Sequence, residues 1–483
     1  MNVRVGIVGG GVAGLAAAVA LVERGCQVGI FEARRKLGGR AGSYVDRETG
    51  DAIDHCQHVA MGCCTSYLDF CRRTGIDELF TRHSRLHFFG PDGRRSDFEP
   101  SQWLPAPLHL VGPLAALKYL SWGDKWSIGR AMLKLARTGA EDAEEGPTVL
   151  EWLIGQRQNA AAIERFWKVV LVSALGESLD RASLAAARKV FVDGFLGNRR
   201  AADVLVPNVS LDELYDRRIA NWLRERGAAI HVETPVESVT GDSNRATGIL
   251  MANGREEPFN FVIAAVPWSK LPRLLPAAML DAADPKHVAE EMASAPISSV
   301  HLWFDRSITD LPHAVLVERL TQWVFARAMS CQVEPEEANA LTPALSQRER
   351  EQQEHYYQVV ISASHDLAGR DRESVVEEVL KDLRSVFSEA KGAQLLRAKL
   401  ITEPQAVFSV QPGLDAKRPR QQTAIPNLLL AGDWTRTGWP ATMEGAVRSG
   451  YLAAEGVLER VDRRQRIVVA DLPRGWLARA FRL

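Results

Sequence analysis

The sequence has no excess of charge of either sign and no long hydrophobic run. Its 59 lysine and arginine residues face 60 aspartate and glutamate residues, which leaves a formal net charge of −1. Without a basic stripe or a block of like charge, nothing in the composition indicates a nucleic-acid partner. No stretch is apolar for long enough to span a bilayer. The chain enters an apolar strand within its first residues, without a basic region and a cleavage site, so we expect a cytoplasmic protein whose only membrane contact would be peripheral.

Cysteine is scarce. There are six cysteines, and four of them lie between Cys56 and Cys71. His55 and His58 lie near them, but neither the paired C-x-x-C units nor the H-x₃-H spacing of zinc sites is present. We therefore expect no metal site, and free, partly buried thiols in a reducing compartment.

The N-terminal segment, VRVGIVGGGVAGLAAAVALVERGCQVGIFEA, predicts a strand, a glycine turn, a helix and a second strand that leads to Glu32. It contains G-x-G-x-x-G in the position that dinucleotide binding requires. Gly9 permits a tight turn, Gly11 lets a pyrophosphate approach the backbone, and Gly14 permits close packing of the helix on the strand. Glu32 is placed to accept hydrogen bonds from a ribose. This arrangement predicts that the chain binds a dinucleotide.

A second strand, turn and helix lie near the C-terminal end, in NLLLAGDWTRTGWPATMEGAVRSG. We predict a strand over residues 427–433 and a helix that begins near Pro440. The free N–H groups of this first turn, up to Met443, and the positive end of the helix dipole would stabilise an anionic group, and Glu444 would stabilise the helix start by its charge. Small residues recur in this helix at helical spacing: Gly445, Ala446, Ser449, Gly450, Ala453 and Ala454. They would let the helix lie against another backbone or a flat ring, although an ordinary packing helix has the same pattern.

The loop RRKLGGRAG after Glu32, taken with the late AGDW and GWPATMEGAVRSG, resembles the flavin amine oxidase and phytoene desaturase superfamily. The resemblance implies FAD as cofactor and an α/β fold in which a discontinuous Rossmann-type FAD-binding domain carries an inserted α+β substrate-binding domain. In that family the Gly-Gly-Arg loop wraps the pyrophosphate, the late Gly-Asp contacts the ribityl phosphate, and the following helix points at the flavin ring. The residues expected to bind FAD are Gly9, Gly11, Ala13, Gly14, Glu32, Ala33, Gly39, Arg40, Val236, Gly432, Asp433, Thr442 and Met443.

Segments typical of the cofactor domain occur three times, separated by stretches rich in tryptophan, proline and amphipathic helices. We expect the FAD-binding domain to comprise residues 1–78, 204–267 and 401–465, and the substrate-binding domain to comprise residues 79–203 and 268–400. In the second cofactor segment we predict a helix followed by a strand that ends at Val236. Residues 331–358 are polar and dense in charge, which predicts a surface insertion.

The stretch DHCQHVAMG, residues 54–62, together with the late helix motif, resembles the hydroxysqualene dehydroxylases within that superfamily. This resemblance implies reductive dehydroxylation of hydroxysqualene, an allylic alcohol, to squalene, in squalene and hopanoid biosynthesis. His58 is the expected proton donor and Gln57 the residue that orients the hydroxyl, while a hydrogen bond from His58 to the flavin or to a loop carbonyl is the alternative. No second glycine fingerprint is present for a nicotinamide, so the sequence does not identify an electron donor.

Two other functions fit the same motifs. An oxidative relative, either a carotenoid-type desaturase or an amine oxidase, would use the flavin in the opposite redox direction. A prenyl-binding protein of the same fold, as in the Rab GDP-dissociation inhibitors, would bind its ligand without turnover. The intact glycines, Glu32 and Asp433 argue against this last function.

Two segments suit contact with a membrane. The tail, residues 466–483, ends in DLPRGWLARAFRL, a basic amphipathic pattern that fits an anionic membrane surface, and a packed or frayed terminal helix is the alternative. The segment from Trp103 to Trp122 is apolar and broken by prolines, which suits the mouth of an apolar tunnel. A core-facing loop and helix is the commoner explanation for such residues.

Overall fold

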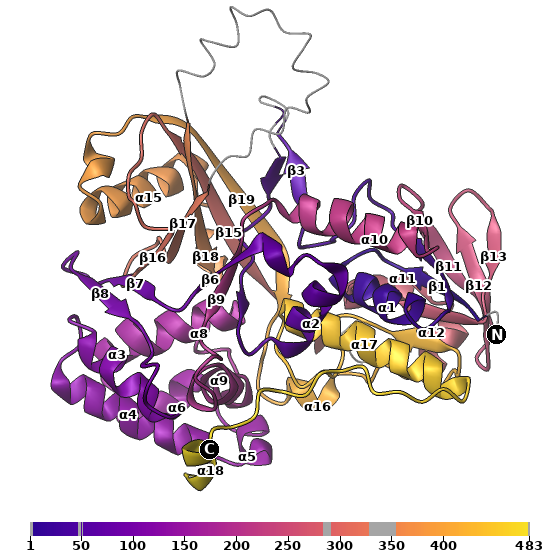
Figure 1. The fold of residues 1–483 in the computed structure, drawn as a ribbon, viewed down its shortest axis with the longest axis horizontal. Coiled ribbons are helices and arrows are strands. Elements are labelled where there is room, and N and C mark those ends of the chain that lie inside the picture. The colour runs from indigo at the N-terminus through magenta and orange to yellow at the C-terminus, as the bar shows by residue number, and fades with distance from the viewer. Residues whose placement is uncertain (1–2, 47–49, 51, 284–290, 328–353, 482–483) are drawn as a thin grey trace, which may run out of the picture.

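The computed structural model describes residues 3–46, 50, 52–283, 291–327 and 354–481. Two large sheets and a group of short helices make up most of the chain (Figure 1). A parallel sheet with its long helices lies on one side, the second large sheet lies beside it, and the short helices form a layer at the lower edge, where the C-terminal end also lies.

The parallel sheet has five strands in the order β10, β2, β1, β14, β20. Its strands are short apolar runs such as RVGIV in β1 and FVIA in β14, as expected of a parallel sheet that is covered on both faces. Their bounds are β1 (Arg4–Val8), β2 (Gln27–Phe31), β10 (Ala229–His231), β14 (Phe261–Ala264) and β20 (Leu428–Leu430). The sheet therefore combines three separate parts of the chain, and the predicted fold class, a discontinuous Rossmann-type domain with an inserted α+β domain, is confirmed.

Helices α1 (Val12–Val22) and α17 (Met443–Arg460) pack closely together beside this sheet (Figure 1). A Cβ on Gly450 would lie 2.3 Å from the carbonyl oxygen of Ala13, so the contact requires glycine. The small residues of α17 thus serve close approach to another backbone. Helices α2 (Thr65–Thr74) and α10 (Ala220–Glu225) also pack on α1.

The late strand is shorter than predicted, ending at Leu430 instead of Asp433. The reason is the backbone of Gly432, which has a φ of +148° and donates its N–H to Ser449 Oγ at 2.8 Å rather than to a neighbouring strand. Strand pairing therefore stops before the Gly-Asp pair and leaves it in a turn.

A smaller antiparallel sheet contains β11 (Val236–Gly241), β12 (Ala246–Met251) and β13 (Glu256–Pro258). Val236 begins β11, so the prediction that a strand ends at this residue was wrong. Strand β10 already ends at His231, because the chain then turns through Glu233, whose φ is +51°. The predicted strand is two strands of two different sheets.

The second large sheet has seven strands in the order β19, β15, β18, β17, β16, β7, β8, and the only parallel pair among them is β16 with β7. Helix α15 (Arg372–Val386) packs against β19. The strand bounds are β7 (Leu86–Phe89), β8 (Arg95–Phe98), β15 (Ser294–Phe304), β16 (His313–Leu316), β17 (Trp323–Arg327), β18 (His355–Ser362) and β19 (Leu395–Phe408).

Two of the predicted segment boundaries fall within strands of this sheet. The boundary expected after residue 400 falls inside β19, because the pairing of β19 with β15 continues to Phe408. Residues 355–358 of the expected surface insertion belong to β18, where they pair with β15 and β17. Residues 331–353 of that insertion lie outside the described residues.

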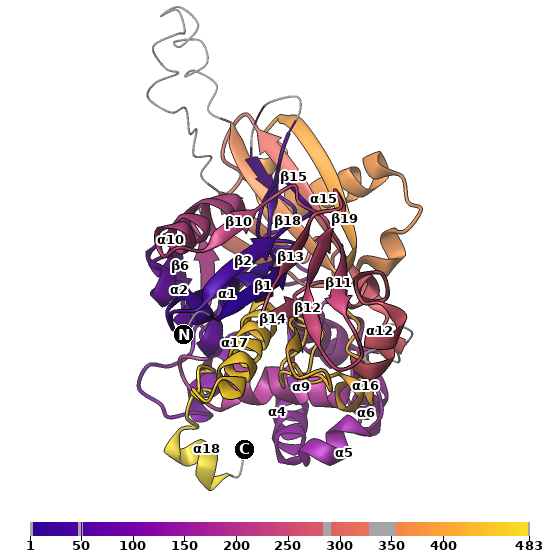
Figure 2. The ribbon, with the colours of Figure 1, turned by 90° about the vertical axis from the view of Figure 1, so that its right-hand side faces the viewer.

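The layer of short helices covers the lower edge of the molecule (Figure 2). Its members are α3 (Val111–Ala116), α4 (Trp122–Arg137), α5 (Ala140–Glu144), α6 (Val149–Gly155), α7 (Ala160–Ala162), α8 (Lys168–Leu175) and α9 (Leu184–Phe191). The remaining short elements include β3 (Ser43–Val45), β4 (Ala52–Asp54), β5 (Ala60–Met61), β6 (Phe80–His83), β9 (Val204–Pro207), α11 (Leu271–Leu274), α12 (Ala277–Ala283), α16 (Leu414–Lys417) and α18 (Trp476–Ala480). Within the described ranges, no helix has the length and apolarity needed to cross a bilayer.

Candidate functional site

The turn between β1 and α1 contains three glycines with different surroundings. Gly9 has a φ of +110°, and a Cβ there would lie 2.4 Å from the carbonyl oxygen of Ala265. A Cβ on Gly14 would lie 2.1 Å from the carbonyl oxygen of Gly9. A Cβ on Gly11 would meet only the Cα of Gly39, at 3.9 Å. The packing of the protein itself therefore requires glycine at positions 9 and 14, whereas Gly11 borders space that the described chain leaves open.

Helix α1 begins at this opening without a side-chain cap. Gly11 is the N-cap residue, and Ala13 lies buried in the first turn. Because no side chain of the described residues satisfies the first N–H groups of the helix, they remain available to an anionic ligand. The opening therefore suits a phosphate group.

Glu32 lies at the end of β2 and is 8% exposed. One carboxylate oxygen accepts the N–H of Gly10 at 2.8 Å, and the other accepts the N–H of Arg34 at 2.8 Å. Thr234 donates its N–H to the Glu32 carbonyl oxygen at 2.9 Å, which brings the segment before Val236 to the end of β2. Ala33, the next residue after Glu32, is exposed. The acid predicted to face a ribose thus also fixes the glycine turn.

The Gly-Gly-Arg loop lies directly on the glycine turn. Gly38 donates its N–H to the Gly10 carbonyl oxygen at 2.9 Å, and Gly39 has a φ of +64°. The Arg40 guanidinium pairs with Asp433 at 2.6 Å. Three of the predicted cofactor segments, 9–14, 38–40 and 432–433, are therefore joined into one cradle.

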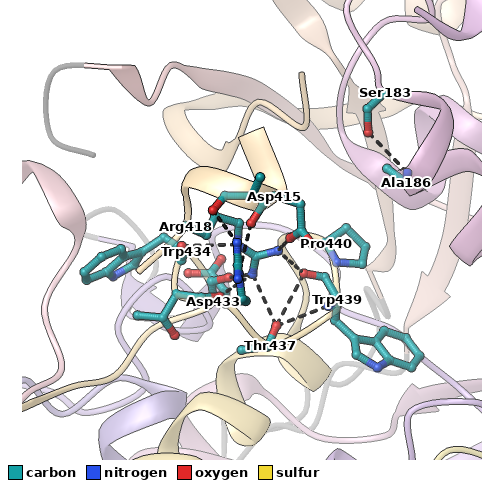
Figure 3. Close-up of polar contacts among 12 residues, drawn as sticks. Ser183, Ala186, Asp415, Arg418, Asp433, Trp434, Thr437, Trp439 and Pro440 are labelled. Atoms are coloured by element: carbon teal, nitrogen blue, oxygen red, sulfur yellow. Dashed lines mark hydrogen bonds and ion pairs between the residues drawn. The ribbon is translucent and has the colours of Figure 1, made fainter. Parts of the chain in front are cut away.

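A buried arginine, Arg418, binds the loop that carries Asp433 through several hydrogen bonds (Figure 3). Arg418 is 5% exposed and its guanidinium contacts six groups of the chain. It donates to the carbonyl oxygens of Asp433 (2.7 Å), Trp434 (3.3 Å), Thr435 and Trp439 (2.8 Å), to Thr437 Oγ1 (3.2 Å), and to the carboxylate of Asp415 (2.5 Å). Arg418 thus sets the path of the turn between β20 and α17.

Helix α17 begins at Met443 and not near Pro440, so the prediction of its start was wrong by one turn. Thr442 is the N-cap, and its Oγ1 accepts the N–H of Gly445 at 3.1 Å. Pro440 instead lies in the turn that Arg418 holds (Figure 3). Met443 accepts a hydrogen bond from the hydroxyl of Tyr215 at 3.3 Å.

Glu444 has a different role from the one predicted. Its buried carboxylate accepts the N–H groups of Ser66 (3.1 Å) and Tyr67 (2.7 Å), the first amides of α2, and pairs with Arg448 at 2.6 Å. It therefore caps a neighbouring helix, and does not act on α17 by charge alone. Burial raises the pKa of Glu444 from its ordinary value.

The loop at residues 54–58 is tied to the seven-stranded sheet. The buried Asp54 carboxylate accepts the Ser43 hydroxyl at 2.6 Å and the N–H of Leu211 at 2.9 Å. It also forms an ion pair with Arg327, which lies at the end of β17. This ion pair links the loop to the seven-stranded sheet.

A chain of three side chains on the seven-stranded sheet ends on the same loop. Burial lowers the pKa of His301 to about 3, so its ring is neutral at pH 7. Ser299 donates its hydroxyl to the carbonyl oxygen of His55 at 2.7 Å, so it must accept from His301 Nε2 at 2.9 Å. His301 Nδ1 then accepts the hydroxyl of Tyr356 at 2.7 Å. The direction of each hydrogen bond is thereby determined.

Gln57 and His58 lie at the end of this loop. Gln57 Nε2 donates to the carbonyl oxygen of His58 at 3.1 Å, whereas Gln57 Oε1 is buried and has no hydrogen-bond partner among the described residues. His58 Nδ1 lies 3.0 Å from the carbonyl oxygen of Cys56, so it carries the proton and leaves Nε2 as an acceptor. Burial lowers the pKa of His58, while the positive charge of Arg40 acts in the same direction. The loop-carbonyl hydrogen bond expected as the alternative is present, and donation of a proton from Nε2 would require prior protonation of the ring.

Sequence reasoning missed the groups that position this site. Arg418 lies in the run AKRPRQQ, which is typical of a solvated basic surface, and nothing local separates it from the exposed Arg420. Arg327 and His301 lie in strands far along the chain from residue 54. No local signal marks any of the three.

The five described cysteines are free thiols, and Cys63, Cys64 and Cys71 are buried.

The chain combines a Rossmann-type sheet with a second large sheet, and a glycine turn, a Gly-Gly-Arg loop and a Gly-Asp turn converge at the first of these. This arrangement defines an oxidoreductase that binds a dinucleotide cofactor. The chain belongs to the family of flavin containing amine oxidoreductases, whose sequence profile matches residues 12–458. It is an FAD-dependent oxidoreductase. The residues present fit the cofactor, because Gly11 leaves room where a Cβ would intrude and no described side chain caps the first N–H groups of α1.

Relatives align along nearly the whole chain. The chain is 27% identical over 497 residues to the zeta-carotene desaturase of Synechocystis sp., which covers 97% of this chain and 100% of that protein. It is 25% identical to the 15-cis-phytoene desaturase of Synechococcus elongatus, with 96% and 97% covered. The solved structure of cyclohexylamine oxidase from Brevibacterium oxydans is similar in fold, with a TM-score of 0.65 at 18% identity and coverage of 96% and 100%.

Proposed function

We propose that the chain is an oxidoreductase of long isoprenoid hydrocarbons. The main support is the charge balance around residues 54–58. Asp54 is paired with Arg327 and Asp433 with Arg40, and burial lowers the pKa of both His55 and His58, which keeps them neutral at pH 7. Such a site suits an uncharged hydrocarbon better than a cationic amine, because a buried cation needs a free carboxylate.

FAD, when bound, supplies hydride transfer in either direction, so the same cradle serves oxidation or reduction. The first candidate reaction is oxidative, a carotenoid-type desaturation. Full-length similarity to a zeta-carotene desaturase and a 15-cis-phytoene desaturase supports it. The protein's part in this reaction is to hold an extended, neutral chain and to exclude water from it.

The second candidate reaction is reductive, the dehydroxylation of hydroxysqualene to squalene. The DHCQHVAMG stretch supports it, and so does the unpartnered Gln57 Oε1, which can accept a hydrogen bond from a substrate hydroxyl. The bond from Gln57 Nε2 to the His58 carbonyl fixes which end of the amide remains available. A pure hydrocarbon would leave this buried acceptor unsatisfied, at a cost of about 1–3 kcal/mol.

An anaerobic experiment with two arms tests the proposal. Oxidised holoprotein is mixed with phytoene or zeta-carotene, and photoreduced holoprotein is mixed with hydroxysqualene, while flavin absorbance and extracted products are followed. Bleaching with a more conjugated product supports desaturation, and reoxidation with stoichiometric squalene supports dehydroxylation. If neither arm changes the flavin although the protein binds the lipids, a prenyl-binding function replaces the proposal. Turnover of amines alone would refute it.

The Gln57→Leu variant separates the two reactions. Loss of the amide acceptor should raise KM for hydroxysqualene about 5- to 150-fold, which corresponds to the cost of one unpaired buried polar group. Desaturation of a pure hydrocarbon should be unchanged. The Gln411→Leu variant, a change of the same type outside this loop, is the control. An unaltered KM for the alcohol would remove the support that Gln57 gives to dehydroxylation.

A further inference from the structure

The exposed aromatic residues of the chain gather in two segments at the layer of short helices. All 12 tryptophans and 16 phenylalanines belong to the described residues, and few of them are exposed. The exposed ones are Trp103 (93%), Trp122 (74%), Trp126 (79%), Trp476 (65%) and Phe481 (39%). Large aromatic side chains are costly to leave in water, so their confinement to two segments indicates a surface with a partner.

Direct contacts bring the two segments together. Gly475 precedes α18, and a Cβ built on it would lie 3.6 Å from the Cβ of Ala106. Gly475 also donates its N–H to the carbonyl oxygen of Gly197 at 2.9 Å. Arg199 donates to the carbonyl oxygen of Gln102. Both views place α18 at the lower edge of the molecule beside the short helices (Figures 1 and 2). The tail is therefore packed next to the loop that carries Trp103.

Helix α4 shows how this surface is built. Ile128, Ala131 and Leu135 are buried, so one side of the helix packs on the core. The other side presents Trp122 and Trp126, one turn apart, to solvent, although solvent-facing positions of such a helix are ordinarily polar. We call the exposed large apolar side chains of residues 103–126 and 476–481 the aromatic face: Trp103, Leu104, Leu108, Val111, Trp122, Trp126, Trp476 and Phe481.

The two segments that carry the aromatic face are themselves rich in basic residues. Residues 101–139 contain one acidic residue, Asp124, which is buried in the capping box of α4. The same stretch contains five basic residues: Lys118, Lys125, Arg130, Lys134 and Arg137. Residues 472–481 contain Arg474 and Arg479 and no acid. The Lys125 ammonium lies 4.7 Å above the ring of Trp122, so cationic and aromatic groups are interleaved.

We propose that the aromatic face docks on the surface of an anionic phospholipid bilayer. Tryptophan rings prefer the headgroup level of a membrane, and basic side chains near the surface are attracted to anionic lipids. A second copy of the chain is a poorer partner, because two copies of this positively charged face would repel each other across a symmetric interface. If the substrate is a long isoprenoid, the face also holds the enzyme where that substrate dissolves. This last consequence rests on the proposed function, whereas the docking itself does not.

Vesicle binding by the FAD-loaded full-length protein tests the proposal. Sedimentation is compared for vesicles of phosphatidylcholine with phosphatidylglycerol and for vesicles of phosphatidylcholine alone, at low and high salt. We expect binding that is about tenfold or more stronger with the anionic lipid and that weakens with salt. Quenching of tryptophan fluorescence by brominated lipids should accompany binding.

Matched variants identify the surface. The double variant Trp103→Ser/Trp126→Ser should lower the vesicle partition coefficient about tenfold or more, whereas Trp222→Ser on α10, away from this edge, should leave it unchanged. Arg130→Glu should weaken binding about fivefold or more, and Arg372→Glu on α15 should not. Equal melting temperatures and FAD contents among the variants exclude unfolding as the cause.

Three results would overturn the docking proposal. The first is that the protein does not bind anionic vesicles, and the second is that the Trp222→Ser control loses as much binding as the double variant. The third is that sedimentation velocity shows a dimer that dissociates in the double tryptophan variant, while vesicle binding is absent. The last result would assign the face to contact between copies. Because the readout needs no turnover, vesicle binding by a protein inactive towards isoprenoids would refute the proposed function and leave the docking proposal standing.

Discussion

The same substitution should affect cofactor binding at one glycine of the motif and stability at another. Alanine at Gly11 meets little of the protein, since the nearest atom to its Cβ would be 3.9 Å away and the residue has an ordinary φ of −73°. Alanine is a poorer N-cap than glycine, so the free energy of unfolding of the apoprotein should fall by about 1 kcal/mol or less. The methyl group would instead enter the space that we assign to the pyrophosphate. Crowding of this kind costs about 1–3 kcal/mol, so the Kd for FAD should rise about 5- to 150-fold.

Alanine at Gly14 should act on the fold itself. Its Cβ would lie 2.1 Å from the carbonyl oxygen of Gly9, a backbone atom that cannot rotate away. Overpacking of this severity costs about 3 kcal/mol, while the helix propensity of alanine returns about 1 kcal/mol. The apoprotein should therefore lose about 2 kcal/mol of free energy of unfolding.

Urea unfolding of the apoproteins and titration with FAD by fluorescence quenching measure both effects. Gly155→Ala is the control, because a Cβ at Gly155 would meet no atom of the described residues within 4 Å and its φ is not positive. Wild-type FAD affinity in Gly11→Ala would show that the pyrophosphate does not pass this residue. Equal stability of Gly14→Ala and Gly155→Ala would contradict the steric reasoning.

Three further predictions concern groups that hold the site. Arg418→Met should lower the free energy of unfolding by about 3 kcal/mol, because several buried carbonyl oxygens lose their donor, while the exposed Arg420→Met should change it by less than about 0.5 kcal/mol in the same urea experiment. Burial lowers the pKa of His301 from an ordinary 6.5 to about 3 in the folded protein. The stability that neutral His301 contributes is therefore complete above pH 6.5 and is lost as the pH falls towards 3, by up to about 1.4 kcal/mol per pH unit. The variant His301→Asn should flatten this dependence of the free energy of unfolding on pH, and an unchanged slope would assign it to other groups. Glu444→Gln weakens the cap of α2 and should cost about 2 kcal/mol, with faster hydrogen exchange at the first amides of α2; unchanged exchange there would show that the cap is dispensable.

The cofactor half of the site could be predicted because its determinants are local. A strand, a glycine turn and a helix are adjacent in the chain, so the positions of Gly9, Gly11 and Gly14 carry the geometry with them. The Gly-Gly-Arg loop is equally compact. The predicted residues of these two segments lie together in the structure, and Arg40 pairs with Asp433 from a segment almost 400 residues away.

Predictions failed where the answer depended on a partner far away in the chain. Local charge suggested that Glu444 serves its own helix, but its carboxylate caps α2 because α17 packs against that helix. The predicted start of α17 used Pro440 as a first helical residue, although Arg418 binds the preceding carbonyl and holds the turn open. Neither contact leaves a trace in the neighbouring sequence.

The sequence by itself determined the cofactor class and the α/β fold, because backbone freedom at glycine and the apolar character of buried strands are written in adjacent residues. Only the tertiary structure decided that Arg418 is a buried anchor, that Arg327 pairs with Asp54, that His301 is neutral, and that the two distant segments with exposed tryptophans touch each other. Burial and long-range pairing set these properties. They depend on which surfaces meet when the chain folds, and that information is distributed over the whole sequence.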